Sequence, residues 1–287
     1  MAENVDFRNC VLYNWGSGNG CYGGPGGGQI NIINNYYKAG PATKNTKRVT
    51  EISVGSNGNS TEGDMIGMTS RYFIQGNYVE AAGPQAQDYD WKGVAFDNGV
   101  QTIDTQPYTL DAGNYYQDVA HKTYNGKPYA AIKLTTPIAT GAVTTHKATK
   151  AYEKVLAFAG ASLFRDTVDV RYNQEANHGT ATYTGSKTGR PGIIDVVKDV
   201  DGYTEKNFPT GKRSADFDRD NDGLPDAWEQ ANGLNPNDAT DALTNSLDPK
   251  GYYTNLEVYA NSLVEDLVKR ENQDAETSVD EYYPACN

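Results

Sequence analysis

The sequence is poor in the residues that build disulfide scaffolds, histidine metal centres and membrane spans. Its 287 residues include only three Cys, three His and three Met. No stretch approaches the roughly 20 apolar residues that cross a bilayer, so we expect no membrane span. Cys10, Cys21 and Cys286 cannot all pair, and we expect unpaired, partly buried thiols. The histidines lack the H-E-x-x-H spacing of a zinc protease.

Positive charge is also scarce. The chain carries 25 Lys and Arg against 37 Asp and Glu, which gives a net charge of −12. Nucleic acids and anionic membranes are held mainly by basic patches, so we expect neither as a partner. The first residues, MAENVDFRNC, have no basic region and no apolar core, so we expect no signal peptide in this chain.

Gly and Tyr are abundant instead, at 30 and 21 residues, which favours a β-rich, turn-rich chain. Three stretches near the start repeat one pattern: VDFRNCVLYNW (5–15), INIINNYYKAG (30–40) and YFIQGNYVEAAG (72–83). Apolar positions alternate within each, as in a strand with one buried face. The alignment superposes Val5, Ile30 and Tyr72, then Phe7, Ile32 and Ile74, then Val11, Tyr36 and Tyr78.

Each repeat is interrupted at the same place, by Asn9-Cys10, Asn34-Asn35 and Gly76-Asn77. Asn and Gly tolerate the left-handed conformation that a sharp bend needs. Strand, bend and strand in succession predict a partial right-handed parallel β-helix, whose bend asparagines bond to the coils above and below. Three unrelated strands of a β-sandwich are the alternative.

The rest of the chain divides by composition. We predict β-helix coils with long loops over 1–140, a helical or irregular extension packing on them over 141–213, a calcium-binding segment over 214–270, and a frayed acidic tail over 271–287. In the extension, Thr145 is expected to cap a helix over 145–162, and Asp166 and Gly179 to bound a second. The calcium segment is expected to hold a short helix over 225–232 and one longer helix after Thr254.

The stretch DRDNDGLPDAWE (218–229) has the spacing of an EF-hand calcium loop. Ca²⁺ takes roughly six to eight oxygen ligands, and this spacing wraps them around one ion. Gly223 permits the sharp turn, Leu224 offers its carbonyl, and Asp226 acts directly or through water. The predicted ligands are Asp218, Asp220, Asp222, Leu224, Asp226 and Glu229.

A second loop follows in the same register, with Gly251 and Glu257 at the sixth and twelfth places. Ser246 and Lys250 stand where ligands are required, and a lysine repels the ion. We therefore expect a metal-free partner that packs against the first loop. A sensor exposes a Met-rich groove, and this region has no Met, so calcium is expected to stabilise the segment.

Several of these stretches resemble bacterial pectate lyases of polysaccharide lyase family 1. VDFRNCVLYNWG and INIINNYYKAGPAT are similar to late β-helix coils of that family. AYEKVLAFAGAS, RDTVDVRYNQEANHGT and GRPGII resemble its following helical stretch, and DRDNDGLPDAWEQANGLNPND with YYTNLEVYANSLV resembles its C-terminal calcium segment. The resemblance implies a secreted or periplasmic protein that degrades pectate (polygalacturonate) or another acidic polysaccharide.

The resemblance also implies calcium-dependent β-elimination, in which an arginine in an R-x-P-x-x-R setting removes a proton. The only Arg-Pro pair, Arg190-Pro191, lies elsewhere and has no second arginine. We therefore expect this chain to be the C-terminal portion of such an enzyme, without its catalytic coils. An exposed first coil would then favour self-association.

Two alternatives remain open. One is a non-catalytic, calcium-stabilised β-helix that binds acidic polysaccharide. The other is a β-helix glycoside hydrolase that uses a carboxylate pair drawn from Glu62, Asp64, Asp88 and Asp90.

Overall fold

The computed structural model describes residues 4–18, 20–21, 28–53, 70–96, 123–124, 127–128, 132–200 and 211–286. Glu62 and Asp64, two of the four carboxylates named above, lie outside these ranges.

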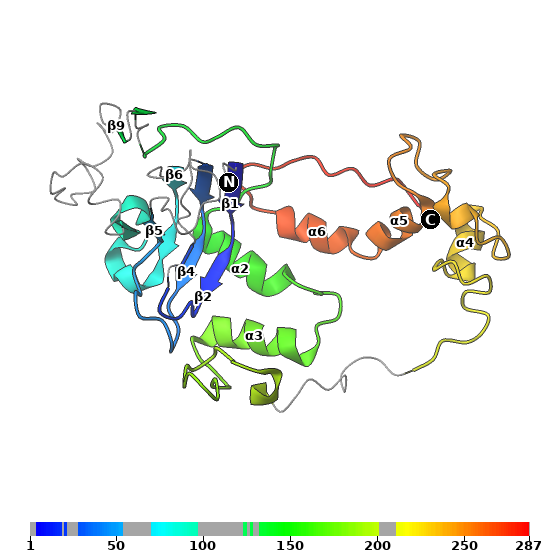
Figure 1. Ribbon diagram of the computed structural model, residues 1–287. Coiled ribbons are helices and arrows are strands. Elements are labelled where there is room, and N and C mark those ends of the chain that lie inside the picture. The colour runs from blue at the N-terminus through cyan, green and yellow to red at the C-terminus, as the bar shows by residue number, and fades with distance from the viewer. Residues whose placement is uncertain are drawn as a thin grey trace.

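The strands of the three repeats stack in parallel (Figure 1). One ladder has the order β1-β3-β6 and joins Asn4–Arg8, Gln29–Ile33 and Arg71–Gln75. A second has the order β2-β4-β7 and joins Val11–Tyr13, Tyr36–Lys38 and Tyr78–Val79. The third pairs β5 (Thr50–Ile52) with β8 (Val94–Phe96).

The register predicted from the alignment is confirmed. Val5 pairs with Ile30 and Ile30 with Tyr72, and the two other predicted rows pair likewise. A one-residue slip would turn every apolar side chain to the opposite face, so the alternation of buried residues specifies this register.

The bends also behave as predicted. Asn9, Asn34 and Gly76 have φ values of 52°, 53° and 74°, in the left-handed region. Among non-glycine residues this region is most accessible to Asn and Asp, because their short polar side chains bond locally. The repeated Asn and Gly therefore bend the chain at the same position in each repeat, between its first and second strands.

Stacked amides join the bends of successive coils. Asn35 Oδ1 accepts from the backbone N of Cys10 at 3.0 Å, and Asn77 Oδ1 accepts from the backbone N and Nδ2 of Asn35 at 3.1 and 3.0 Å. Asp90 ends the row by accepting from the backbone N and Nδ2 of Asn77. Asn35 and Asn77 are both fully buried, so this row satisfies polar groups that water cannot reach.

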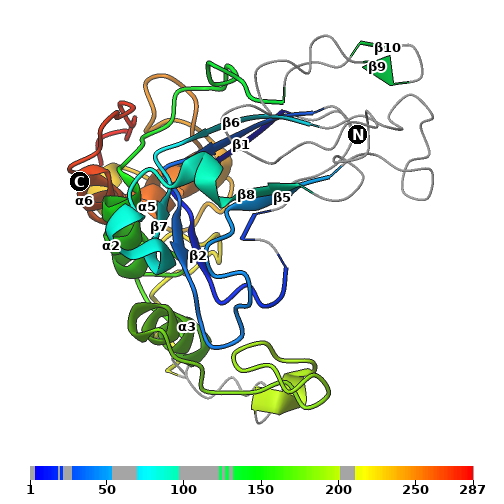
Figure 2. The same cartoon turned by 90° about the vertical axis from the view of Figure 1, so that its left-hand side faces the viewer.

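The hydrophobic core lies inside the three ladders, which surround a common interior in Figure 2. Its buried members come from every ladder and from the segment after them: Ile32, Tyr37, Val49, Ile52, Tyr72, Ile74, Val79 and Ile132. The same coils thus supply both the apolar core and the polar row along its edge.

Short elements complete this region. They are η2 (Glu80–Gln85), η3 (Asp90–Gly93) and the antiparallel pair β9 (Thr123–Tyr124) and β10 (Lys127–Pro128).

Two helices, α2 (Ala148–Phe158) and α3 (Thr167–His178), lie beside the coils (Figure 1). The predicted limits of α3 are confirmed, because Asp166 accepts from two backbone N–H groups and Gly179 ends the helix with a φ of 71°. The predicted cap of α2 was wrong. Thr145 instead forms an antiparallel bridge with Thr277, and α2 begins without a side-chain cap. Beyond α3 lies η5 (Val197–Val200).

The last part of the chain, from residue 211, holds α4 (Asp226–Asn232), η6 (Asp241–Leu243), α5 (Asn255–Ser262) and α6 (Glu265–Asn272). The short helix over 225–232 is confirmed. The single long helix expected after Thr254 was wrong, because the chain breaks at Leu263 and Val264 between α5 and α6.

The expectation of a frayed tail was also wrong for residues up to 286. Thr277 pairs with Thr145, the backbone N of Val279 donates to Thr144 Oγ1 at 3.1 Å, and the Tyr282 hydroxyl donates to Asp248 at 2.5 Å. The tail therefore runs from the coil region to the loop that contains Asp248.

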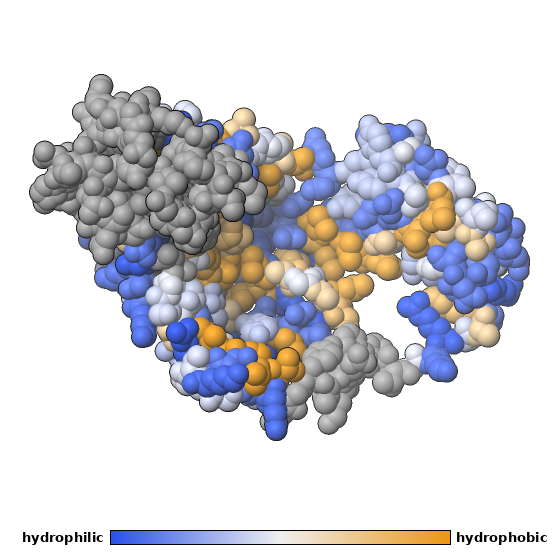
Figure 3. Space-filling model, in the orientation of Figure 1, coloured by the Kyte–Doolittle hydropathy of each residue, from blue (hydrophilic) through white to orange (hydrophobic). Residues whose placement is uncertain are grey.

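Helix α6 packs on α2, where Lys154 Nζ donates to the carbonyl of Arg270. Figure 3 shows hydrophobic residues concentrated towards the centre of the view and hydrophilic ones around the outer edge at the α4–α5 end. None of the helices in the described ranges is long and apolar enough to cross a membrane. Cys10, Cys21 and Cys286 form no disulfide within the described residues, and each is half-buried.

Candidate metal site

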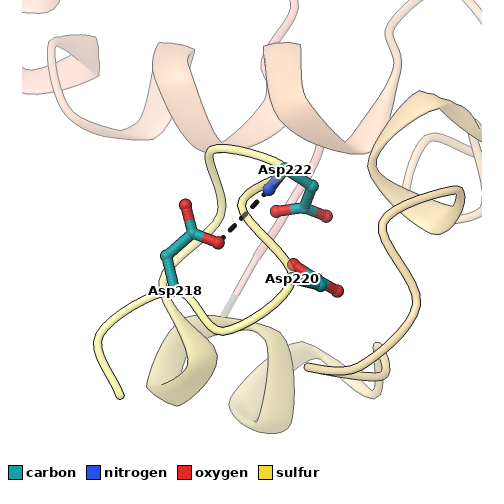
Figure 4. Close-up of side chains that lie close together, drawn as sticks. All are labelled: Asp218, Asp220 and Asp222. Carbon is teal, nitrogen blue, oxygen red and sulfur yellow. Dashed lines mark hydrogen bonds between the residues drawn. The ribbon is translucent and has the colours of Figure 1, made fainter. Parts of the chain in front are cut away.

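The loop before α4 is shaped by its own carboxylates. Asp218 accepts from the backbone N of Asp222 at 3.2 Å and of Gly223 at 3.1 Å, and Asp222 Oδ1 accepts from the backbone N of Leu224 at 2.8 Å. Asn221 and Gly223 have positive φ values of 59° and 98°. These turns bring Asp218, Asp220 and Asp222 around one small space (Figure 4).

Two groups of carboxylates meet at this loop. Oxygens of Asp218, Asp220 and Asp222 all lie within 4.8 Å of one another, and the same holds for Asp222, Glu229 and Asp241. Asp222 belongs to both groups. The structure thus brings four of the predicted ligands together and adds Asp241, which the loop spacing could not identify because it lies outside the loop.

Several oxygens of these carboxylates are buried and receive no hydrogen bond from any residue that the structure describes. They are both oxygens of Asp220, both oxygens of Glu229, Asp222 Oδ2 and Asp241 Oδ1. Glu229 is fully buried. Buried polar atoms are nearly always paired, and an isolated buried carboxylate is costly. The donor set, all carboxylate oxygen, fits a hard cation such as Ca²⁺.

The electrostatics agree with this arrangement. Burial, followed by the charges of Asp222, Asp220 and Asp241, raises the pKa of Glu229 to about 7. Burial also raises the pKa of Asp222, with Asp220 and Asp218 adding to the effect. Like charges crowded together disfavour the ionised form, and a divalent cation among them would remove that penalty.

Leu224 and Asp226 contribute to the loop in other ways. The Leu224 side chain is fully buried, which anchors the loop in the segment's interior. Asp226 Oδ1 accepts from the backbone N of Arg219 at 2.9 Å, and Oδ2 forms an ion pair with Arg219 Nε at 3.0 Å, although it receives no hydrogen bond. The proposed ligand roles of the Leu224 carbonyl and of Asp226 remain predictions.

The second loop satisfies its carboxylate from within the chain. Asp248, also buried, accepts from the backbone N of Lys250, Tyr252 and Tyr253 and from the Tyr282 hydroxyl. Lys250 Nζ lies 3.8 Å from the centre of the Tyr282 ring. Protein donors thus surround the acid in this loop.

Glu257, at the twelfth place of the second loop, has a different function. It accepts from the backbone N and hydroxyl of Thr254, and Thr254 in turn accepts from its backbone N. This capping box starts α5.

Asp88 and Asp90, the two described carboxylates considered for glycoside hydrolysis, have structural partners. Asp90 accepts from the backbone N of Gly76 and from two nitrogens of Asn77. Burial raises the pKa of Asp90, against these hydrogen bonds, which lower it. Asp88 accepts from Gln87 Nε2. Asp90 therefore fixes the bend of the third coil.

Comparison with known proteins gives consistent results. The chain is 30% identical over 265 residues to a protein named Probable pectate lyase C from Aspergillus terreus, 29% identical over 263 residues to one from Aspergillus fumigatus, and 28% identical over 262 residues to one from Emericella nidulans. Each alignment covers 90% of this chain. By sequence, the chain is pectate lyase-like along nearly its whole length.

The chain spans about half the length of these relatives, 48% of the first two and 47% of the third. No protein-family model matches the chain, and no solved structure matches it. The relatives are fungal, and the bacterial character of the resemblance described above remains a prediction.

Proposed function

We propose that this chain belongs to a pectate lyase-like protein that cleaves pectate, or another acidic polysaccharide, by calcium-dependent β-elimination. The observation that carries the proposal is the similarity to proteins named pectate lyase C across 90% of the chain. Such a protein acts outside the cell or in the periplasm, where its polymeric substrate is found.

The coils fit this proposal. Parallel ladders in one register, a shared interior and a row of stacked asparagines support a right-handed parallel β-helix, followed by a helical extension and an EF-hand-like segment. An elongated stack of this kind offers a long surface to a polymer.

Calcium has a stabilising role in the proposed site. Asp218, Asp220, Asp222, Leu224, Asp226 and Glu229 are the proposed ligands, and the ion supplies the positive charge that the buried, unpartnered oxygens of Asp220 and Glu229 lack. This ion holds the segment together and is separate from any calcium that bridges enzyme and substrate.

The proton-abstracting arginine of β-elimination has no counterpart here. Arg190, in the only Arg-Pro pair of the chain, is exposed in a turn where its carbonyl accepts from the backbone N of Gly185 at 3.2 Å. We therefore propose that this chain alone does not perform the elimination.

The test uses the purified chain with polygalacturonate and excess calcium. β-Elimination creates an unsaturated sugar that absorbs in the ultraviolet, so absorbance reports the reaction directly. We expect no increase from this chain alone, and an increase when the corresponding full-length relative is used. An increase from this chain that a chelator abolishes would show that a catalytic site lies within it.

A second candidate is a non-catalytic module that binds acidic polysaccharide. It is favoured by the absence of an R-x-P-x-x-R arginine from the sequence. Saturable binding of polygalacturonate oligomers by calorimetry, without ultraviolet product, would support the module. The glycoside hydrolase alternative has less support, because the Asp90 carboxylate is bound to the backbone and side chain of the third coil.

Self-association through the first coil is part of the same proposal. Among the described strands, β1 and β2 each pair on one side only, with β3 and β4. Unpaired strand edges bind other strands. Sedimentation velocity over a range of concentrations tests this, and a monomer throughout would count against it.

A further inference from the structure

We propose that Asp241, which lies outside the calcium loop, is a ligand of the same ion and so joins the loop to the following half of the segment. The inference rests on the proposed calcium site and names a ligand that the loop spacing does not contain. Three observations carry it. Asp241 has one buried oxygen without a hydrogen bond, and its position is fixed by bonds to other residues. The oxygens of Asp226, in the loop, face Arg219 instead of the other carboxylates.

The two oxygens of Asp241 have different surroundings. Oδ2 accepts from the backbone N of Asn235 at 2.8 Å. Oδ1 is buried, has no hydrogen bond, and belongs to the group with Asp222 and Glu229 whose oxygens lie within 4.8 Å of one another. One oxygen thus fixes the carboxylate while the other faces the fully buried and equally unpartnered Glu229. A cation is the group that satisfies both.

The backbone at Asp241 is held in place by Asn255. Asn255 is fully buried, and its Nδ2 donates to the Asp241 carbonyl at 2.8 Å and to Thr244 Oγ1 at 3.0 Å. The backbone N of Asn255 donates to the Thr244 carbonyl at 2.7 Å. The first residue of α5 is therefore bonded to the η6 turn that carries the Asp241 carboxylate, so the two move together.

Asp226 occupies the ninth place of the loop, where an EF-hand often binds its ion through water. Both oxygens of Asp226 face Arg219 instead. Asp241 supplies the carboxylate oxygen that Asp226 does not present directly. The ion then contacts α4 through Glu229, the loop through its three aspartates, and η6 through Asp241.

This assignment has a structural consequence. Without Asp241 the ion would order only the loop and the start of α4. With it, ion binding also fixes η6 and, through Asn255, the start of α5 and the second loop. The two loops then fold as one unit around a single ion.

The experiment measures calcium binding to the full chain by calorimetry. Asp241→Asn removes the charge and keeps the shape, and we expect it to weaken binding at least about tenfold, which is the scale of the losses seen when support around a metal is removed. Asp238→Asn is the matched control, because it makes the same charge change nearby at an exposed carboxylate whose hydrogen bonds within the described residues are to Thr240. We expect this control to stay within about twofold of the unchanged chain.

The outcomes separate the inference from the site on which it rests. If the unchanged chain binds no calcium, the proposed site itself fails. If it binds calcium and Asp241→Asn behaves like Asp238→Asn, the loop site stands and the role of Asp241 is refuted.

Hydrogen exchange on the unchanged chain gives a second reading that needs no variant to fold. Calcium should protect the backbone N–H groups of Thr244 and Asn255 together with those of Asp222 to Leu224. Protection confined to the loop would overturn the inference.

Discussion

The coil region and the acidic loop before α4 both bury polar groups, and they surround them in opposite ways. In the coils, neutral amides stack so that each donor meets an acceptor of the next coil, as Asn35 does with Asn77. In the loop, carboxylates face one another and leave the buried oxygens of Glu229 without a donor. The stacked amides satisfy one another within the polypeptide, whereas the loop leaves carboxylate oxygens for which we propose a cation.

The second loop lies between these extremes. It places Asp248 where the first loop places Asp220, but backbone N–H groups and the Tyr282 hydroxyl take the place of an ion. The protein's own donors satisfy the buried carboxylate of the second loop, and a metal is our proposal for the first. The difference depends on which donors the rest of the chain brings within reach.

Removing calcium should have the largest effect. An ion that binds only the folded segment stabilises it by about 4 kcal/mol when its free concentration is about 1,000 times the dissociation constant. Chelation should therefore lower the melting temperature of the calcium segment, and Asp222→Ala should have the same effect in the presence of calcium. Calorimetric melts with and without chelator test this. Identical melting temperatures with and without chelator would show that the loop, like the coils, is stable without a cation.

The second-largest loss of stability is expected when the row of stacked amides between the coils is broken. Asn77 is fully buried and bonds to Asn35, Asp90 and the Ile32 carbonyl. Asn77→Ala leaves several buried groups unpaired and should lower the free energy of unfolding by about 2–3 kcal/mol, independently of calcium.

Gln87→Ala is the control for that change. Gln87 is exposed, and within the described part of the chain its side chain bonds to Asp88 alone, so the loss should stay within about 0.5 kcal/mol. Chemical denaturation of both variants, with and without calcium, gives the comparison. A calcium-dependent loss at Asn77 would show that the two regions are energetically coupled.

The smallest effect is expected in the second loop, and it depends on pH. Burial alone would raise the pKa of Asp248, but the hydrogen bonds from Tyr282, Lys250, Tyr253 and Tyr252 outweigh it and hold the pKa at about 2, below the ordinary 3.8. A lowered folded-state pKa contributes stability that is present above the ordinary value. That stability should be lost as the pH falls from about 4 to about 2.

Tyr282→Phe removes one of those hydrogen bonds. It should reduce stability at neutral pH and narrow the acid-sensitive range, because the pKa of Asp248 moves back towards its ordinary value. The difference between this variant and the unchanged chain, measured in calcium-free buffer from about pH 2 to 7, cancels the titration of the first loop. No difference at any pH would mean that the tail does not support the second loop.

Local sequence carried much of the fold in the coils. The alternation of apolar residues and the repeated Asn and Gly at the bends predict which residues pair, because each repeat carries the same pattern and a shifted register would expose its apolar side chains. The capping of α3 by Asp166 followed from the same kind of information. The spacing of acids in the loop brought Asp218, Asp220, Asp222 and Glu229 together for the same reason.

Contacts between segments far apart in the chain could not be predicted from the local sequence pattern. Thr145 has the features of a helix cap, yet it pairs with Thr277 in the tail. Asp90 could belong to a catalytic pair, yet it ends the row of asparagines. In each case a polar side chain has several short-range options, and a partner remote in sequence determines which one is realised.

The sequence by itself determined the register of the parallel strands, because the same pattern recurs in each repeat. It also determined the acidic loop, because the spacing of its carboxylates acts over a few residues. Only the tertiary structure placed Asp241 beside Glu229 and Tyr282 beside Asp248. These contacts depend on how η6, α5 and the tail pack. Burial then strengthens the electrostatic interactions of the carboxylate or hydroxyl, which its position in the sequence does not reveal.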